Sequence, residues 1–145
     1  MPSFWILKTD ADTYPFAQLE REGRTVWDGV SNALALKHIR AMAPGDRLLI
    51  YHSGDEKALV GLARVVSAPY ADPKGKDSKL TVVDIEAGAR LPRPVSLAAI
   101  KADPAFRDLA LVRMSRLSVV PVPAAQWTRL LDMAGLPASA RAAQS

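Results

Sequence analysis

The chain has 145 residues, of which 49% are hydrophobic, a size and composition that fit one globular domain with its own core. It has no cysteine, which excludes a disulfide framework, a thiolate nucleophile and a cysteine-ligated zinc site. Its 19 basic and 15 acidic residues give a formal net charge of +4, a modest excess that permits an anionic partner without requiring one.

The N-terminal part of the chain predicts a strand followed by two helices. Residues 4–7 form a short apolar run, which is typical of a buried strand and is followed too soon by charge to be a signal peptide. A short helix is expected over residues 15–22, because proline suits a first helical turn and Gly23 ends the segment. Residues 31–42 predict an amphipathic helix, since apolar positions recur at spacings of three and four: Ala35, Leu36, Ile39 and Met42.

The middle of the chain predicts three strands and a polar loop. The apolar runs 47–52 and 59–66 indicate central strands, and Gly61 in the second run predicts a bulge or a close approach of the backbone. Residues 69–79 are rich in Asp, Lys, Gly and Ser and predict a loop. Residues 81–87 alternate in polarity and predict a further strand, with one face formed by Thr81, Val83, Ile85 and Ala87.

The C-terminal part predicts short helices, a last strand and a last helix. Ser96 and Asp103-Pro104 are good starts for two short helices, and residues 117–122 predict a strand with proline at its edge or end. Trp127 begins an apolar helical stripe that Gly135 ends, so we expect this tryptophan in the core. We expect residues 1–136 to form one domain and the patternless residues 137–145 to be a mobile tail.

This order of elements favours the α+β class. Five or six strands alternate irregularly with helices, and curled strands with a glycine bulge favour a small β-barrel flanked by helices over an open sheet. No apolar run approaches the roughly 20 residues needed to span a bilayer, so we expect a cytoplasmic protein without a membrane partner. A monomer is favoured.

The segment Thr25-Val26-Trp27-Asp28-Gly29-Val30-Ser31-Asn32 is the most informative motif. Asp28-Gly29 is turn chemistry, and Ser31 or Asn32 can cap the following helix, leaving backbone N–H groups free for a ligand. Trp27 offers a flat π-face that suits stacking on a planar base. The alternative is a buried tryptophan before an ordinary capped helix.

In sequence order, the motifs of this chain resemble those of the EVE domain family, a branch of the PUA-like superfamily. The similarity runs from about residue 4 to residue 127. The motifs that carry it are Phe4-Trp5-Ile6-Leu7-Lys8-Thr9-Asp10, Trp27-Asp28-Gly29-Val30-Ser31-Asn32, Met42-Ala43-Pro44-Gly45-Asp46, Tyr51-His52-Ser53, Val60-Gly61-Leu62-Ala63-Arg64-Val65-Val66, Pro69-Tyr70-Ala71-Asp72-Pro73 and Ser115-Arg116-Leu117-Ser118-Val119.

The resemblance implies a PUA-like barrel flanked by helices, with a pocket for a modified nucleobase in DNA or RNA. We expect a binding module without catalysis and without a cofactor. Most members carry an arginine after Trp-Asp-Gly-Val, and often a tyrosine and a glutamine in the next turn. Here Ser31, Leu34 and Ala35 stand in those places, which removes a cation, an aromatic ring and an amide from the start of the helix.

A pocket for one flat base needs aromatic walls and a few convergent hydrogen-bonding groups. Trp27 and Trp5 are candidate walls, and the ring of Tyr51 is a candidate third surface. Asp28 can accept from an exocyclic amine, while Asn32 and Ser53 can donate and accept. The motifs place two basic residues, Lys8 and Arg116, to meet a phosphate. The remaining candidate ligand-binding residues are Val30, His52, Leu117 and Ser118.

Several candidates also fit purely structural roles. Trp5 lies within a predicted strand and Tyr51 ends one, so both fit the core, where a tyrosine hydroxyl needs a partner. His52 could meet a phosphate or act as a base, although a histidine beside a strand end is more often structural. His38 lies off the apolar stripe of its helix and is expected to face solvent.

The sequence argues against an enzyme. Adjacent His52 and Ser53 on one strand point to opposite faces, so they do not form a nucleophile–base pair with Asp28 as a third member. Two histidines without cysteine or a spaced carboxylate cluster argue against a catalytic metal. The leading hypothesis is thus a binding module for a modified base. The second hypothesis is an accessory interaction domain that binds a small nucleotide-like metabolite.

Overall fold

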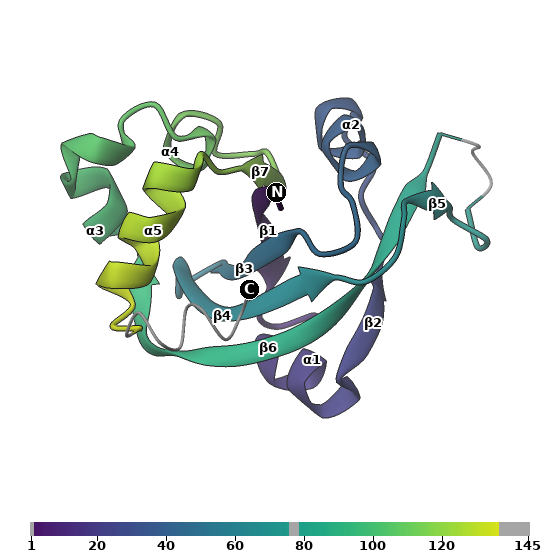
Figure 1. The fold of residues 1–145 in the computed structure, drawn as a ribbon, viewed down its shortest axis with the longest axis horizontal. Coiled ribbons are helices and arrows are strands. Elements are labelled where there is room, and N and C mark those ends of the chain that lie inside the picture. The colour runs from purple at the N-terminus through teal and green to yellow at the C-terminus, as the bar shows by residue number, and fades with distance from the viewer. Residues whose placement is uncertain (1, 76–78, 137–145) are drawn as a thin grey trace.

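The computed structural model describes residues 2–75 and 79–136, which form one curled sheet with helices around it (Figure 1). The strands are β1 (Phe4–Asp10), β2 (Arg24–Trp27), β3 (Arg47–Ser53), β4 (Ala58–Val65), β5 (Tyr70–Ala71), β6 (Thr81–Ser96) and β7 (Val119–Pro121). The helices are α1 (Phe16–Glu22), α2 (Ala33–Arg40), α3 (Leu97–Ala102), the 3-10 helix η1 (Pro104–Phe106), α4 (Ala110–Arg113) and α5 (Ala124–Met133). No helix within these two ranges is long and apolar enough to cross a membrane.

The sheet has seven strands in the order β2-β6-β4-β3-β1-β7, with β5 paired to β6. β1 and β3 are parallel, and the other described pairs are antiparallel. The strands curl into a half-barrel, and α2 packs against both β6 and β7 (Figure 1). The α+β class is therefore confirmed, and the predicted small β-barrel is a half-barrel whose edge strands β2 and β7 do not pair with each other. The prediction of five or six strands missed β2 and β5.

β6 is much longer than the predicted strand at residues 81–87. It runs for 16 residues and pairs with β2, β4 and β5. Pro92 and Pro94, which argue against a strand, lie where the ladder to β4 is out of register, between the pairs Gly61↔Arg90 and Leu59↔Val95. Proline is tolerated there because a bulge requires no regular donation to the neighbouring strand.

Gly61 confirms the predicted close approach. A Cβ atom at this position would lie 2.2 Å from Cζ of Phe16, the first residue of α1, and Phe16 is fully buried. The register between β3 and β4 also shifts here, between Ile50 and Tyr51. The missing side chain lets the Phe16 ring rest on the strand, so the position of α1 and of the loop before it depends on this contact.

Other local predictions have mixed outcomes. Asn32 caps α2, since its Oδ1 accepts from the backbone N–H of Ala35 at 3.0 Å, and Gly29 adopts a positive φ of 79°. Trp127 is buried and stacks on Phe4 with ring centroids 4.8 Å apart, as expected of a core residue. The predicted loop at residues 69–79 contains β5, and the predicted tail at residues 137–145 lies outside the described residues.

Candidate functional site

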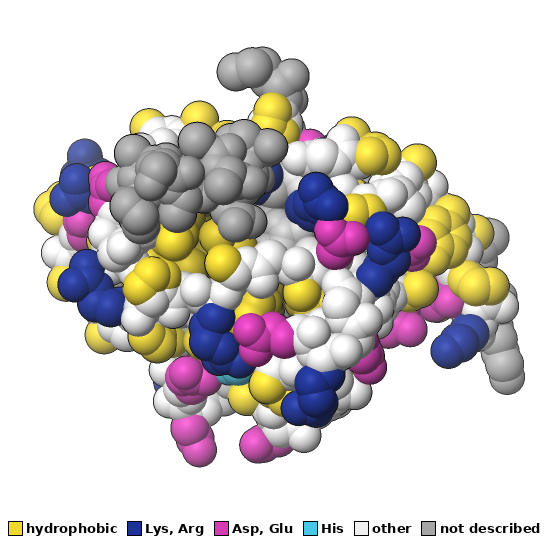
Figure 2. Space-filling view, turned by 60° about the horizontal axis from the view of Figure 1, so that its bottom comes forward, with side chains coloured by type: hydrophobic (Ala, Val, Ile, Leu, Met, Phe, Trp, Pro, Cys, Tyr) yellow, Lys and Arg dark blue, Asp and Glu magenta, His cyan; other side chains and the backbone are white. Residues whose placement is uncertain are grey.

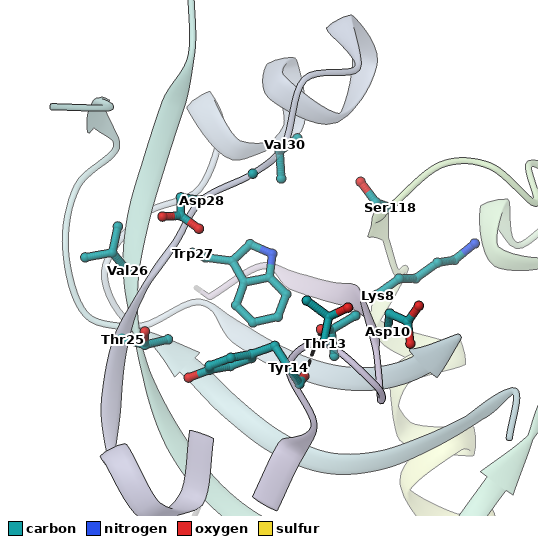
Figure 3. A pocket seen from close by; sticks show the side chains of 12 residues that line it. Lys8, Asp10, Thr13, Tyr14, Thr25, Val26, Trp27, Asp28, Val30 and Ser118 are labelled. Carbon is teal, nitrogen blue, oxygen red and sulfur yellow. Dashed lines mark hydrogen bonds between the residues drawn. The ribbon is translucent and has the colours of Figure 1, made fainter. Parts of the chain in front are cut away.

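A pocket of about 500 Å³ lies between the two edges of the curled sheet (Figure 3). Its walls come from the end of β1, the loop before α1, the strand β2 with the turn after it, and the residue before β7. The residues that line it are Lys8, Thr9, Asp10, Thr13, Tyr14, Thr25, Val26, Trp27, Asp28, Gly29, Val30 and Ser118. We call this cavity the Trp27 pocket.

Trp27 forms the aromatic wall of this pocket. It is the last residue of β2, where pairing with Val83 of β6 fixes its backbone, and its indole ring points into the cavity (Figure 3). Trp27 as a residue is 8% exposed, so most of its surface is packed, and it borders the pocket. The Tyr14 ring meets it edge to face with centroids 6.0 Å apart. A stacking surface held this way loses little conformational freedom when a ligand binds.

Tyr14 is itself fixed at both ends. Its backbone carbonyl accepts a hydrogen bond from the Thr9 hydroxyl at 2.8 Å, and its phenol donates to Glu22 at 2.5 Å. Burial, together with the neighbouring Glu22 carboxylate, raises the pKa of the Tyr14 phenol. The ring therefore stays a neutral support for Trp27 at physiological pH.

The pocket also carries polar groups that form no hydrogen bond with the described residues. Asp28 is exposed, and its carboxylate accepts no hydrogen bond from the residues that the structure describes. The backbone N–H groups of Gly29 and Val30 likewise donate to no described residue. A carboxylate acceptor and two backbone donors thus lie within one turn of the tryptophan. Such a set can read the polar edge of a heterocycle.

Lys8 and Ser118 lie on the side of the pocket away from Thr25 and Val26 (Figure 3). Lys8 is half-buried, and its ammonium donates to the carbonyl of Ser115 at 3.0 Å. It also lies 5.7 Å from the centroid of the Tyr51 ring. Burial lowers the pKa of Lys8, because the charged form loses hydration.

The other candidates do not meet in this pocket. Tyr51 and Ser53 line a second cavity of about 270 Å³, which also borders Lys8. Asn32, Arg116 and Leu117 line a third, more open cavity of about 420 Å³. The prediction of one pocket containing Trp27, Asn32, Tyr51 and Ser53 is therefore wrong, because these side chains are distributed over three different cavities.

Trp5 is a core residue in a different place. It is 7% exposed, its indole N–H donates to the Asp46 carboxylate at 3.0 Å, and its ring lies 5.6 Å from that of His38. The prediction that Trp5 forms a second wall beside Trp27 is wrong, because Trp5 does not line the Trp27 pocket and borders a separate hollow together with Phe4 and Leu109. His38 is half-buried by the same contact and does not simply face solvent as expected; burial and Lys37 lower its pKa.

His52 has a structural role. Its Nε2 accepts from the backbone N–H of Phe16 at 2.9 Å, so Nδ1 carries the proton and donates to Glu56 at 2.6 Å. The ring is buried and joins the start of α1 to the turn between β3 and β4. It lines none of the three cavities above, and both of its ring nitrogens already have partners, so the role of His52 as a ligand-binding residue stays a prediction without support from this geometry. It also forms no triad with Asp28 and Ser53, which line different cavities.

Several residues that line the Trp27 pocket were not predicted from the sequence. Tyr14, Thr13 and Asp10 belong to the end of β1 and the loop after it, and Thr25 and Val26 belong to β2. The only sequence signal for β2 was its place immediately before the Asp28-Gly29 turn, and its four residues are too few to show alternating polarity. Within residues 2–75 and 79–136, no three His, Cys, Asp or Glu side chains gather where they could hold a metal ion.

The curled mixed sheet with an aromatic-walled pocket between its edges is the architecture expected of a PUA-like domain. Residues 3–133 match the family model described as the EVE domain, and the chain belongs to this family. The resemblance inferred from the motifs is thereby confirmed.

Solved structures show the same fold along nearly the whole chain. Rpa0253 from Rhodopseudomonas palustris is 39% identical with a TM-score of 0.87, over 92% of this chain and 93% of that one. Atu2648 from Agrobacterium tumefaciens is 33% identical with a TM-score of 0.90, over 92% and 94%. Human THYN1, solved in complex with DNA containing 5-methylcytosine, shares the fold at 24% identity and a TM-score of 0.82, over 93% and 99%.

Proposed function

We propose that this chain is a non-catalytic binding module that takes one modified nucleobase of DNA or RNA into the Trp27 pocket. The observation that carries the proposal is the indole face of Trp27, which borders a cavity of about 500 Å³ beside unused hydrogen-bonding groups. This volume lies in the range of small-molecule pockets, roughly 300–1,000 Å³. Stacking of one base on an aromatic ring contributes about 1–3 kcal/mol.

The polar groups support a base that presents both donors and acceptors. The Asp28 carboxylate can accept from an exocyclic amine, and the N–H groups of Gly29 and Val30 can donate to a ring nitrogen or a carbonyl oxygen. A cytosine-type edge offers such a combination. The complex of the relative human THYN1 with DNA containing 5-methylcytosine supports the same class of ligand.

The charge distribution favours a second candidate, a small nucleotide-like metabolite bound by an accessory domain. Figure 2 shows basic and acidic side chains interspersed over the face that carries α1 and the middle of β6, without a continuous basic track. Around the sheet, Arg24 and Arg64 both pair with Glu86, and Arg90 pairs with Glu20. These arginines are neutralised, so they are poor candidates for a long nucleic-acid surface.

Titration calorimetry separates the two candidates. A reader of nucleic acid binds an oligonucleotide containing 5-methylcytosine more tightly than 5-methyl-2′-deoxycytidine, and its affinity falls as salt rises. A metabolite-binding domain binds the nucleoside and the oligonucleotide equally, with little dependence on salt.

Two tryptophan variants test the pocket assignment. Trp27→Phe keeps an apolar ring in a largely buried place, and we expect it to fold and to lose about tenfold in affinity for the oligonucleotide, about 1.4 kcal/mol. Trp127→Phe is the matched control, because that ring is buried against Phe4 and lines none of the described cavities. A folded Trp27→Phe protein that binds as tightly as the parent would show that the base does not occupy this pocket.

A further inference from the structure

The second cavity has a composition unlike that of the Trp27 pocket. It borders the turn between β3 and β4, the helices α3 and α4, and Ser115, and it holds about 270 Å³. Three lysines line it, Lys8, Lys57 and Lys101, together with the hydroxyl-bearing residues Tyr51, Ser53 and Ser115. No acidic residue lines it. We call this cavity the lysine pocket.

The three lysines lack anionic partners. None of them forms an ion pair with a carboxylate in the described part of the chain, whereas Arg24, Arg64, Arg90 and Arg129 all do. The nearby turn does carry Asp55 and Glu56, but neither lines the pocket, and the Glu56 carboxylate is hydrogen-bonded to His52. Several like charges around one small hollow concentrate a positive potential that an anion would relieve.

Lys8 and Lys57 both adopt energetically unfavourable arrangements, Lys8 through burial of its ammonium group and Lys57 through its backbone conformation. Lys8 is half-buried with a carbonyl and an aromatic ring as its described partners, and burying a cation without an anion is unfavourable. Lys57 has a φ of 47°, the one positive value among the described non-glycine residues. Its carbonyl accepts from Leu97 N–H at 2.8 Å, which ties the strained turn to the start of α3. Backbone strain of this kind concentrates at ligand sites.

The donors of the lysine pocket match a phosphate group. A phosphate presents several anionic oxygens that accept from more than one direction, and lysine serves as a point-charge partner for it. Lys8 also lines the Trp27 pocket, so the two cavities adjoin at this side chain. We propose that the lysine pocket binds a phosphate group of the nucleotide whose base occupies the Trp27 pocket, an assignment that rests on the proposed function. Arg116, which the motifs had placed with Lys8 at a phosphate, lies at the third cavity instead.

A first experiment tests the anion site without any base. Inorganic phosphate is titrated into ¹⁵N-labelled protein at constant ionic strength, and the amide signals of Gly54, Lys57 and Ser115 are followed. We expect these signals to shift in the parent and in the control Lys37→Ala, whose exposed lysine lies on α2. We expect no saturable shift at Gly54 and Ser115 in the double variant Lys57→Ala/Lys101→Ala, whose lysines are also exposed. A double variant that responds like the parent, or a parent without a response, overturns the proposal.

A second experiment tests whether one ligand occupies both pockets, and it identifies the source of the phosphate. Calorimetry compares 5-methyl-2′-deoxycytidine, its 5′-monophosphate and an oligonucleotide containing the same base. For the parent protein we expect the affinity for a ligand that carries phosphate to be about tenfold or more above its affinity for the nucleoside. We expect the double variant to lose this gain in affinity while keeping its affinity for the nucleoside. A gain already complete with the monophosphate assigns the phosphate to a free nucleotide. A gain seen only with the oligonucleotide assigns it to a polymer backbone.

The same measurements distinguish failure of this proposal from failure of the proposed function. Nucleoside binding that depends on Trp27 but gains nothing from phosphate overturns the lysine pocket and leaves the base pocket standing. A saturable phosphate response without binding of nucleoside or oligonucleotide overturns the base-binding function and leaves only an anion site, so the link between the two pockets fails.

Discussion

The phenol ring of Tyr14 meets the indole of Trp27 edge to face, with ring centroids 6.0 Å apart and planes inclined at 79°. The two residues come from different parts of the chain. Tyr14 precedes α1, whose first residue is packed on Gly61, and Trp27 ends β2, which the ladder to β6 holds. The contact therefore fixes the orientation of the indole relative to the pocket that it lines.

Two substitutions of Tyr14 separate its ring from its hydroxyl. Tyr14→Phe removes the hydrogen bond to the exposed Glu22 but keeps the ring contact, so we expect ligand affinity close to that of the parent. Tyr14→Leu removes the edge-to-face contact, worth about 0.5–1.5 kcal/mol, and we expect affinity to fall up to about tenfold as Trp27 gains freedom. Calorimetry with the oligonucleotide measures both. Equal affinities in the two variants would mean that the ring does not position the indole.

Gly61→Ala should destabilise the fold through a clash with Phe16. The added Cβ would lie 2.2 Å from the ring, and Phe16 has no free space because it is fully buried. Overpacking of this kind costs about 1–3 kcal/mol. Urea unfolding of Gly61→Ala, Phe16→Leu and the double variant forms a thermodynamic cycle. We expect Phe16→Leu to relieve part of the cost, whereas additive free energies would show that the two positions are not coupled.

The Tyr70–Asp84 hydrogen bond predicts a pH dependence at the alkaline end. The Asp84 carboxylate, 2.6 Å from the Tyr70 hydroxyl, raises the pKa of that phenol to about 12. Because the folded pKa lies above the unfolded value of about 10, the bond stabilises the fold below about pH 10, and this contribution is lost as pH rises through 12. Ultraviolet titration of tyrosinate should show this group titrating earlier in Asp84→Asn. An unchanged titration curve in that variant would exclude the bond as the cause.

Ser31→Arg should strengthen binding to nucleic acid. Ser31 is exposed, and Asn32 rather than Ser31 caps α2, so the substitution leaves the helix start intact. If the arginine meets a phosphate, the slope of log affinity against log salt should steepen by about 1. Ser31→Gln is the control of similar length without the charge. An equal gain in both variants would point to contacts other than a phosphate contact.

The strong apolar runs were predictable because their periodicity is local. The strands at β1, β3 and β4, the cap at Asn32 and the role of Gly61 all follow from neighbouring residues. β2 was missed because four residues beside a turn show no period, and the second half of β6 because Pro92 and Pro94 argue against a strand. Only the register with β4 shows that these prolines fall in a bulge.

The site was harder to predict because it depends on which segments the fold brings together. Trp27 and Asp28 carried a recognisable turn, and both line the pocket. Tyr51 is paired with Lys8 in parallel register, which puts it at the neighbouring cavity, and no local pattern contains that relationship. From the sequence Trp5 fits both a pocket wall and a core residue, and the sequence does not show that its indole N–H donates to the distant Asp46 carboxylate.

The long strand β6 makes the whole chain interdependent. It pairs with β2, β4 and β5, while β7 after it pairs with β1. A backbone break between β5 and β6 would therefore leave an N-terminal peptide with only the β1–β3 and β3–β4 pairs, and a C-terminal peptide in which neither strand has its partner. Such peptides would fold only by complementing each other, at concentrations that support association. Trp27 would reside on one peptide and Ser118 on the other, so recovered ligand affinity would report their reassembly.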